Sequence, residues 1–198
     1  VDLQLLGLDS LRVNGNALEF GATLTLQSFL ESEHCPEALK RALKLEAPLN
    51  VRNSATVAGA LVSCDGRSTF AAALLAMDAK LSVISEQSSV ISVGEFLPLR
   101  PRGLITSITI PLNIKLAFEY VSKTPSDKPI VCAALAQWNS GRTPLALGGY
   151  GQSPMLAMFR TTMPNTDKKT VRPPKWIGWS LISIGGALVA QSLGMRKP

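Results

Sequence analysis

Residues 51–64 are the part of the chain best suited to bind a ligand, because they are small, polar and glycine-containing. The small side chains are those of Ala55, Ala58, Gly59 and Ala60, and Thr56 adds a hydroxyl. Small side chains let backbone N–H groups come within about 3 Å of a bound ligand. We therefore expect residues 56–60 to form an irregular loop that leads towards a helix and directs its N–H groups into a groove. The alternative is a tight loop that only packs against a helix.

Other reactive side chains are scarce. The single histidine, His34, lies between Glu33 and Cys35 and is interpreted as a surface residue. One histidine and 6% aromatic residues argue against a histidine-centred triad, a multi-histidine metal site and base stacking. The sequence therefore predicts no catalytic side chain and no metal site, and the chemistry must come from a cofactor or from elsewhere.

Three cysteines, Cys35, Cys64 and Cys132, are widely spaced and form no CxxC pair. An odd number of separated cysteines fits buried thiols in a reducing compartment better than a disulfide framework or a zinc site. The chain opens with no signal peptide, so a cytoplasmic location is expected.

The net charge of +6 comes from the end of the chain. Residues 1–157 contain 13 basic and 13 acidic residues, whereas residues 158–198 contain 7 basic residues and only Asp167. A nucleic-acid-binding protein would carry its positive charge as a stripe on the folded domain, so no nucleic-acid partner is expected.

Hydrophobic periodicity predicts an α+β fold. Helices are expected at residues 25–32, 36–45 and 68–79. Strands are expected at residues 18–22, 80–85, 89–93, 104–110, 114–122, 130–138 and 145–147. The helices should pack on a mixed or antiparallel sheet, and a second strand-rich segment should follow. The helix at 68–79 should bury Phe70, Leu74 and Leu75, with Asp78 near its end.

Several short motifs, in order and at consistent spacing, resemble one family. The main one is LNVRNSATVAGA at residues 49–60, and LLAMDA follows at residues 74–79. The others are VDL (1–3), GATLTL (21–26), GEF (94–96), LITSITIP (104–111) and LGGYG (147–151). Over about residues 1–157 the chain is similar to the FAD-binding flavoprotein subunit of the molybdenum hydroxylases, such as the carbon monoxide dehydrogenase medium subunit and the xanthine dehydrogenase flavin domain.

The resemblance implies a PCMH-type FAD-binding fold that is incomplete at its N-terminus. Residues 1–111 would be the second FAD-binding subdomain, without the N-terminal subdomain and its glycine-rich loop. Residues 112–157 would begin the family's C-terminal strand-rich domain. The implied partners are a molybdopterin-binding large subunit, which performs the substrate chemistry, and an iron–sulfur small subunit. Electrons would pass from the iron–sulfur clusters through FAD to NAD, a quinone or oxygen.

The family's FAD contacts map onto Asn53, Thr56, Val57, Ala58, Gly59, Ala60 and Thr69. Arg52 and Asn53 would shape the loop, and Arg52 would pair with an acidic neighbour or a partner surface. Three positions depart from the family pattern, because Ala58 replaces a glycine, Ala60 an asparagine or serine, and Thr69 an aspartate. Each lost hydrogen bond is worth about 0.5–1.5 kcal/mol, or up to about 3 kcal/mol with charge. FAD binding should therefore be weak or lost. The alternative is a degenerate assembly or binding module that keeps the fold without the flavin.

Residues 158–198 do not resemble the family. Residues 176–195 are uncharged, lie between Lys175 and Arg196, and satisfy the length of a transmembrane helix. A frameshift is the preferred explanation, because another reading frame permits the family's C-terminal pattern. If the segment is genuine it would anchor the chain in a membrane. In either case we expect it to pack poorly against residues 1–157, as an isolated helix or an irregular tail.

Overall fold

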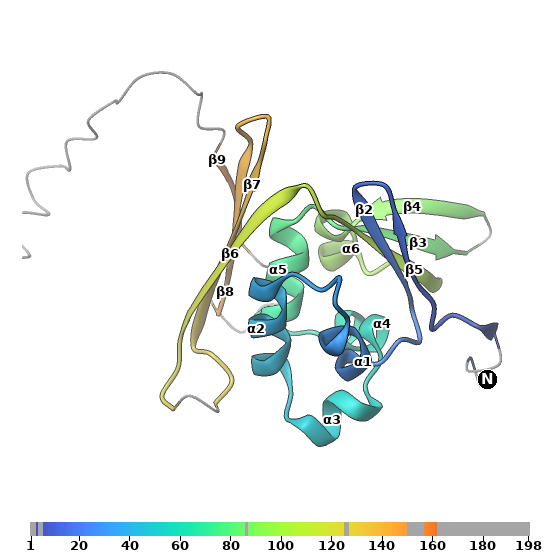
Figure 1. The fold of residues 1–198 in the computed structure, drawn as a ribbon, viewed down its shortest axis with the longest axis horizontal. Helices are drawn as coiled ribbons and strands as arrows, with labels where there is room; N and C mark the ends of the chain where they lie inside the picture. The colour runs from blue at the N-terminus through green and yellow to red at the C-terminus, as the bar shows by residue number, and fades with distance from the viewer. Residues whose placement is uncertain (1–2, 4–5, 86, 125–126, 150–156, 162–198) are drawn as a thin grey trace, which may run out of the picture. The chain divides into compact units, whose positions relative to one another are not determined.

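The computed structural model describes residue 3 and residues 6–85, 87–124, 127–149 and 157–161 (Figure 1). Residues Val1–Pro164 belong to one compact unit. The segment 176–195, and with it the frameshift and membrane hypotheses, lies outside the described residues. Among the described residues, no helix is long and apolar enough to cross a bilayer.

The first sheet has five strands in the order β1-β2-β5-β3-β4, and every pair of neighbouring strands in it is antiparallel. Its strands are β1 (Leu11–Asn14), β2 (Ala17–Gly21), β3 (Lys80–Ile84), β4 (Ser88–Ser92) and β5 (Leu104–Pro111). The inward side chains of β2 and β5, among them Leu18, Phe20, Ile108 and Ile110, are buried. Burial of every second residue along a strand is typical of an antiparallel sheet that has one face against the core.

The second sheet is an antiparallel meander in the order β6-β7-β8-β9. Its strands are β6 (Ile114–Val121), β7 (Val131–Trp138), β8 (Thr143–Gly148) and β9 (Ala157–Thr161). Small residues of β7 and β8, namely Ala134, Ala136 and Ala146, form its buried face. A flat face of small side chains allows a helix to approach closely.

Six helices lie among the described residues, and they are short. They are α1 (Leu26–Glu31), α2 (Glu37–Glu46), α3 (Leu49–Ser54), α4 (Val57–Val62), α5 (Thr69–Ala76) and α6 (Val93–Leu99). The central one is α5, because all eight of its residues are buried and it contacts α2, β7 and β8. Figure 1 shows α5 and α2 beside the second sheet. The alanine-rich α5 thus connects the helical layer to that sheet.

The α+β prediction is confirmed, and the predicted helices and strands agree with the observed ones to within a few residues. The predicted helix at 68–79 ends earlier, at Ala76. Met77 caps it, and Asp78 adopts a left-handed φ of 53°, which a helix cannot continue. Phe70, Leu74 and Leu75 are buried as expected.

The prediction that residues 56–60, within the segment 51–64, form an irregular loop is wrong. Two helices occupy most of this segment, α3 and α4, separated only by Ala55 and Thr56. Small residues are ambiguous in a sequence, because alanine forms helices as readily as it lines a close-approach loop. Here the capping hydroxyl of Thr56 favours the helix, since it accepts a hydrogen bond from the Gly59 N–H.

Candidate functional site

The starts of two helices lie side by side and bring two distant motifs together. Thr25 is the N-cap of α1 and Thr56 is the N-cap of α4, and the two residues form an antiparallel bridge. The Leu26 N–H donates to the Ala55 carbonyl at 3.0 Å, and the Val57 N–H donates to the Leu24 carbonyl at 2.9 Å. Residues 21–26 and 53–60 therefore form one local structure.

The backbone donors of this structure are already used within the fold. The Val57 and Ala58 N–H groups donate to the carbonyls of Leu24 and Ala22, the latter at 3.3 Å. The Gly59 N–H donates to Thr56 Oγ1 at 3.1 Å, and the Ala60 N–H donates to the Thr56 carbonyl at 2.9 Å. The prediction that these groups point into a groove is therefore wrong, because helix capping and the neighbouring segment satisfy them.

What residues 56–60 present outward is a surface of small side chains. Gly59 is exposed, and Ala58 and Ala60 are half-buried. Val57 is buried and anchors the first turn of α4. A Cβ atom added at Gly59 would lie 2.9 Å from Thr56 Oγ1, so the capping hydroxyl itself favours glycine here. A planar or chain-like ligand can lie close to such a surface.

Asn53 lies at the exposed end of α3, immediately before this turn. Its side-chain amide makes no hydrogen bond with any residue that the structure describes. An amide offers two donors and one acceptor oxygen. Asn53 is therefore available to contact a bound molecule.

Thr69 is not part of this surface. Its side chain is fully buried, and its hydroxyl lies 2.7 Å from the Ala42 carbonyl and 3.0 Å from Glu46 Oε2. The same carboxylate oxygen accepts hydrogen bonds from Ser68 Oγ and from the Phe70 N–H, both at 2.9 Å. Glu46 therefore caps the start of α5, and Thr69 supports this cap from inside the domain.

Arg52 holds α3 in place instead of pairing with a carboxylate, so the predicted acidic neighbour is wrong. Its Nε donates to Gln27 Oε1 at 2.9 Å, and one terminal nitrogen donates to the carbonyls of Ala47 at 2.7 Å and Lys44 at 3.3 Å. The guanidinium thus joins α1 to the C-terminal end of α2, where unpaired carbonyls attract a cation.

Arg100 is a second such residue, which the sequence pattern did not reveal. Its guanidinium donates to the Val62 and Cys64 carbonyls, each at 2.7 Å, at the C-terminal end of α4. Arg100 caps α6 with a left-handed φ of 40°. The two partners lie 36 and 38 residues earlier in the chain. No local spacing rule predicts a contact over this distance.

The cysteines and the histidine agree with their interpretation. Cys35, Cys64 and Cys132 are free and buried, and His34 is exposed. Burial raises the pKa of the Cys35 thiol to about 12 and that of Cys132 to about 11, and it also raises the pKa of Cys64. All three thiols are therefore protonated and unreactive in the folded chain near neutral pH.

These residues fit part of what FAD requires. The surface of Ala58, Gly59 and Ala60, with the Asn53 amide beside it, suits one wall of a flavin nucleotide site. It does not form a pyrophosphate cradle, because the N–H groups of residues 57–60 are bonded inside the fold. Among the described residues, this surface therefore offers small side chains and one amide to a ligand, and no backbone N–H groups to a phosphate.

Several solved structures have a similar fold. Quinoline 2-oxidoreductase from Pseudomonas putida 86 matches with a TM-score of 0.64 and 19% identity, over 74% of this chain and 56% of that one. Carbon monoxide dehydrogenase from Hydrogenophaga pseudoflava matches with a TM-score of 0.66 and 18% identity, over 76% and 58%. At this level of identity the likeness shows the fold alone.

The sequence comparisons are more specific. The protein YgfM of Escherichia coli K12 is 29% identical over 150 residues, which are 75% of this chain and 57% of YgfM. The chain thus spans little more than half the length of this relative. The sequence profile of the FAD binding domain in molybdopterin dehydrogenase matches residues 1–113. This match covers more than half of the chain, which therefore belongs to the family of FAD-binding domains of the molybdopterin dehydrogenases.

Proposed function

We propose that this chain is the flavin-holding, electron-transfer component of a molybdenum hydroxylase. It would pass electrons from iron–sulfur clusters through FAD to an acceptor. The observation that carries the proposal is the bridge between Thr25 and Thr56, which joins two of the family's motifs into one exposed surface of small residues. FAD, when bound, supplies the redox chemistry.

Within this proposal the chain's own residues bind and orient the flavin nucleotide. Asn53 would donate from its amide, and Ala58, Gly59 and Ala60 would form the contact wall. Thr56 and Val57 would fix the turn, through the capping hydroxyl and the buried side chain. Thr69 would act from inside the domain, by holding the start of α5 through Glu46.

The proposed partners are a molybdopterin-binding large subunit and an iron–sulfur small subunit. Since the chain covers 57% of YgfM, further contacts would come from the rest of a whole protein. The cytoplasm is the proposed location, because three free, buried thiols suit a reducing compartment.

A second candidate function is a non-flavin assembly module with the same fold. The specific observation in its favour is that the N–H groups of residues 57–60 are all bonded internally. Ala58 and Ala60 further remove polar or flexible groups that the family uses at these positions.

Titration of the full chain with FAD, followed by quenching of flavin fluorescence, tests the proposal. We expect weak binding, which Ala60→Asn should strengthen by up to about tenfold by restoring one hydrogen bond. Val62→Asn, on the exposed side of the same helix, is the matched control and should leave the affinity unchanged.

Three outcomes would contradict this account. Tight, stoichiometric binding to the unmodified chain would show that the substitutions matter little. An equal effect of Ala60→Asn and Val62→Asn would show that residues 56–60 do not contact FAD. Absence of flavin from a complex assembled with both partner subunits would favour the assembly module.

A further inference from the structure

A basic groove lies between the end of α2 and the second sheet. Its cavity has a volume of about 640 Å³. The polar lining residues are Arg41, Lys44, Glu46, Tyr120 and Lys128, and the apolar ones are Leu45, Ala47 and Pro48. A cavity of this size falls in the range of small-molecule sites. None of its lining residues belongs to the proposed flavin surface.

The charges of the groove favour an anion. Three cations come from two separate segments, Arg41 and Lys44 from α2 and Lys128 from the loop before β7. The one acidic lining residue, Glu46, accepts three hydrogen bonds at the start of α5. Its carboxylate offsets one of the three positive charges, so the lining keeps a net positive charge.

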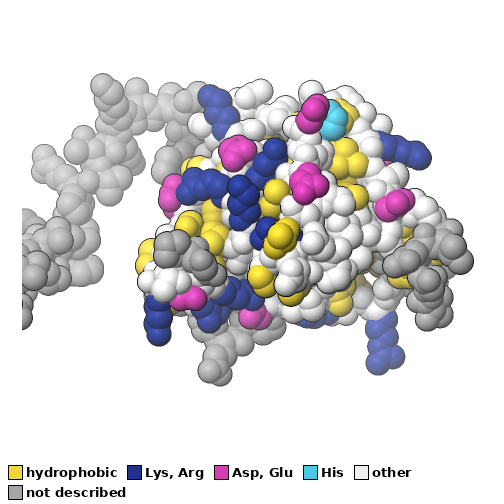
Figure 2. Space-filling model, turned by 60° about the horizontal axis from the view of Figure 1, so that its bottom comes forward, with side chains coloured by type: hydrophobic (Ala, Val, Ile, Leu, Met, Phe, Trp, Pro, Cys, Tyr) yellow, Lys and Arg dark blue, Asp and Glu magenta, His cyan; other side chains and the backbone are white. Residues whose placement is uncertain are grey.

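The cations are also available to a ligand. Arg41 meets Glu119 at 3.7 Å, and Lys128 meets Asp65 at 3.1 Å, in exposed ion pairs of small net value. Lys44 forms no ion pair with any described residue. Figure 2, in which the lower side of Figure 1 comes forward, shows Lys and Arg side chains on this face, with Asp and Glu side chains and hydrophobic atoms among them.

An aromatic wall narrows the class of ligand. Tyr120 lines the groove from β6, half-buried, and its ring stacks on that of Phe118 with centroids 6.2 Å apart. A ring fixed in this way offers a face or an edge to a planar group, while the cations stand ready for phosphate. We propose that this groove binds a nucleoside phosphate, with phosphate on Arg41, Lys44 and Lys128 and the base against Tyr120.

The concave form favours a small molecule over an acidic protein segment. Protein partners bury about 800 Å² on each side of an interface, usually on flatter surfaces. The three cations here instead line a single cavity. The inference does not depend on FAD binding, because the flavin surface is built from other residues.

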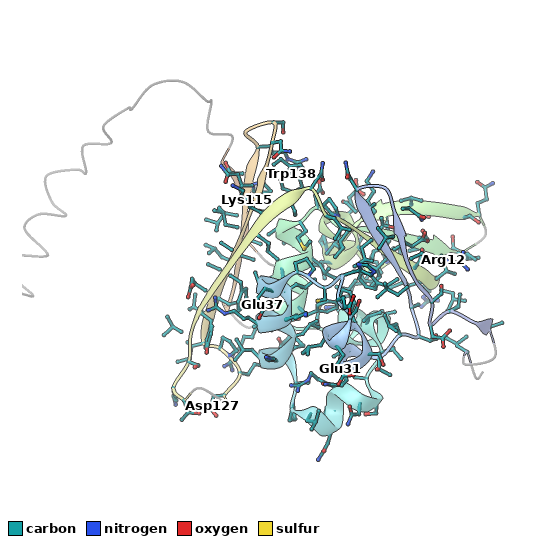
Figure 3. All side chains as sticks on the ribbon, in the orientation of Figure 1. Arg12, Glu31, Glu37, Lys115, Asp127 and Trp138 are labelled. Atoms are coloured by element: carbon teal, nitrogen blue, oxygen red, sulfur yellow. The ribbon has the colours of Figure 1, made fainter. Side chains whose placement is uncertain are left out.

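Calorimetric titration of the full 198-residue chain with ADP and with inorganic pyrophosphate tests the proposal. The double variant Lys44→Gln/Lys128→Gln should weaken ADP binding at least about tenfold, because two charged contacts are lost. Lys115→Gln is the control for the single variant Lys44→Gln, since it also removes one lysine charge, from an exposed position of β6. Figure 3 shows Lys115 near the end of β6 opposite to the loop that holds Asp127.

Tyr120→Leu separates the two halves of the ligand. It should weaken ADP binding about fivefold or more and leave pyrophosphate binding unchanged, because only the base stacks. Thermal unfolding of each variant, followed by circular dichroism, confirms that the fold is kept. Lys44→Gln alone serves if loss of the Lys128 ion pair unfolds the chain, and it should still weaken ADP binding several-fold.

Three results would overturn the proposal. These are no ADP binding to the unmodified chain, an equal loss in Lys115→Gln, and Lys44-dependent binding of a hexaglutamate peptide in place of ADP. Peptide binding would identify an acidic protein partner.

Discussion

Helices α4 and α5 have the same kind of N-cap but differ in how deeply they are buried. Each starts at a hydroxyl N-cap, Thr56 or Ser68, that accepts a hydrogen bond from the N–H three residues later. All residues of α5 are buried, whereas only Val57 and Leu61 of α4 are. The Glu46 carboxylate adds a second acceptor at the start of α5. The same hydroxyl N-cap can therefore begin a core helix or a surface helix, and tertiary contacts determine which of the two forms.

The largest expected effect lies in the buried helix. Leu74→Ala should lower the free energy of unfolding by about 2–5 kcal/mol, because it leaves a cavity in a fully buried site. Urea denaturation measures this loss. Leu99→Ala, at a side chain that is 75% exposed, should cost less than about 0.5 kcal/mol. Similar losses for the two variants would mean that α5 is not the central helix.

The second-largest loss of stability is expected at Glu46, the carboxylate acceptor at the start of α5. Glu46→Gln should lower the free energy of unfolding by about 1–3 kcal/mol, because charge-assisted hydrogen bonds to Ser68, Thr69 and the Phe70 N–H are weakened. Glu37→Gln, an exposed carboxylate in the first turn of α2, is the control. If the two substitutions cost the same, Glu46 contributes only its general helix-terminal charge.

A smaller effect is expected at α4, where the capping hydroxyl acts alone. Thr56→Ala should cost about 1 kcal/mol, and Thr56→Ser much less, because serine keeps the acceptor for the Gly59 N–H. Thermal unfolding of the three proteins makes the comparison. A serine variant as unstable as the alanine variant would assign the loss to packing of the methyl group.

The smallest expected effect is at Gly59. Gly59→Ala should change the free energy of unfolding by no more than about 0.5 kcal/mol, since better helix propensity opposes the 2.9 Å contact with Thr56 Oγ1. In a Thr56→Ala background the same substitution should stabilise the chain by about 0.5–1 kcal/mol, because the contact is gone. Equal effects in both backgrounds would show that the hydroxyl does not restrict this position.

The sequence predicted the elements whose patterns are local. The helix at 68–79 has a hydroxyl N-cap, Ser68, before an apolar run, and the strands at 80–85 and 89–93 alternate between apolar and polar residues. They were confirmed as α5, β3 and β4. Strands β1 and β9 and helices α3, α4 and α6 were not predicted. Strand β1 is short and mostly exposed, and α6 has a proline, Pro98, in its last turn.

The candidate site could be predicted only in part, because its contacts span long distances in the chain. The small side chains of residues 58–60 can be read from the sequence. The N–H groups of Val57 and Ala58, however, donate to the carbonyls of Leu24 and Ala22, more than thirty residues earlier in the chain. Thr69 was assigned from its register with the family, yet Glu46 and Ala42 hold it inside the domain. Alignment with a family assigns equivalent positions to related chains. The packing of each chain determines which residues those positions contact.

The burial of α5 has a consequence for how the chain is made. This helix is synthesised before β7 and β8, the strands that cover one side of it. Until residues 131–148 have left the ribosome, its apolar residues lack that cover and remain open to chaperones or to other nascent chains. Contacts between segments so far apart also slow folding, since a long loop must close first. Synthesis of the second sheet therefore determines when the apolar residues of α5 are covered and the risk of aggregation falls.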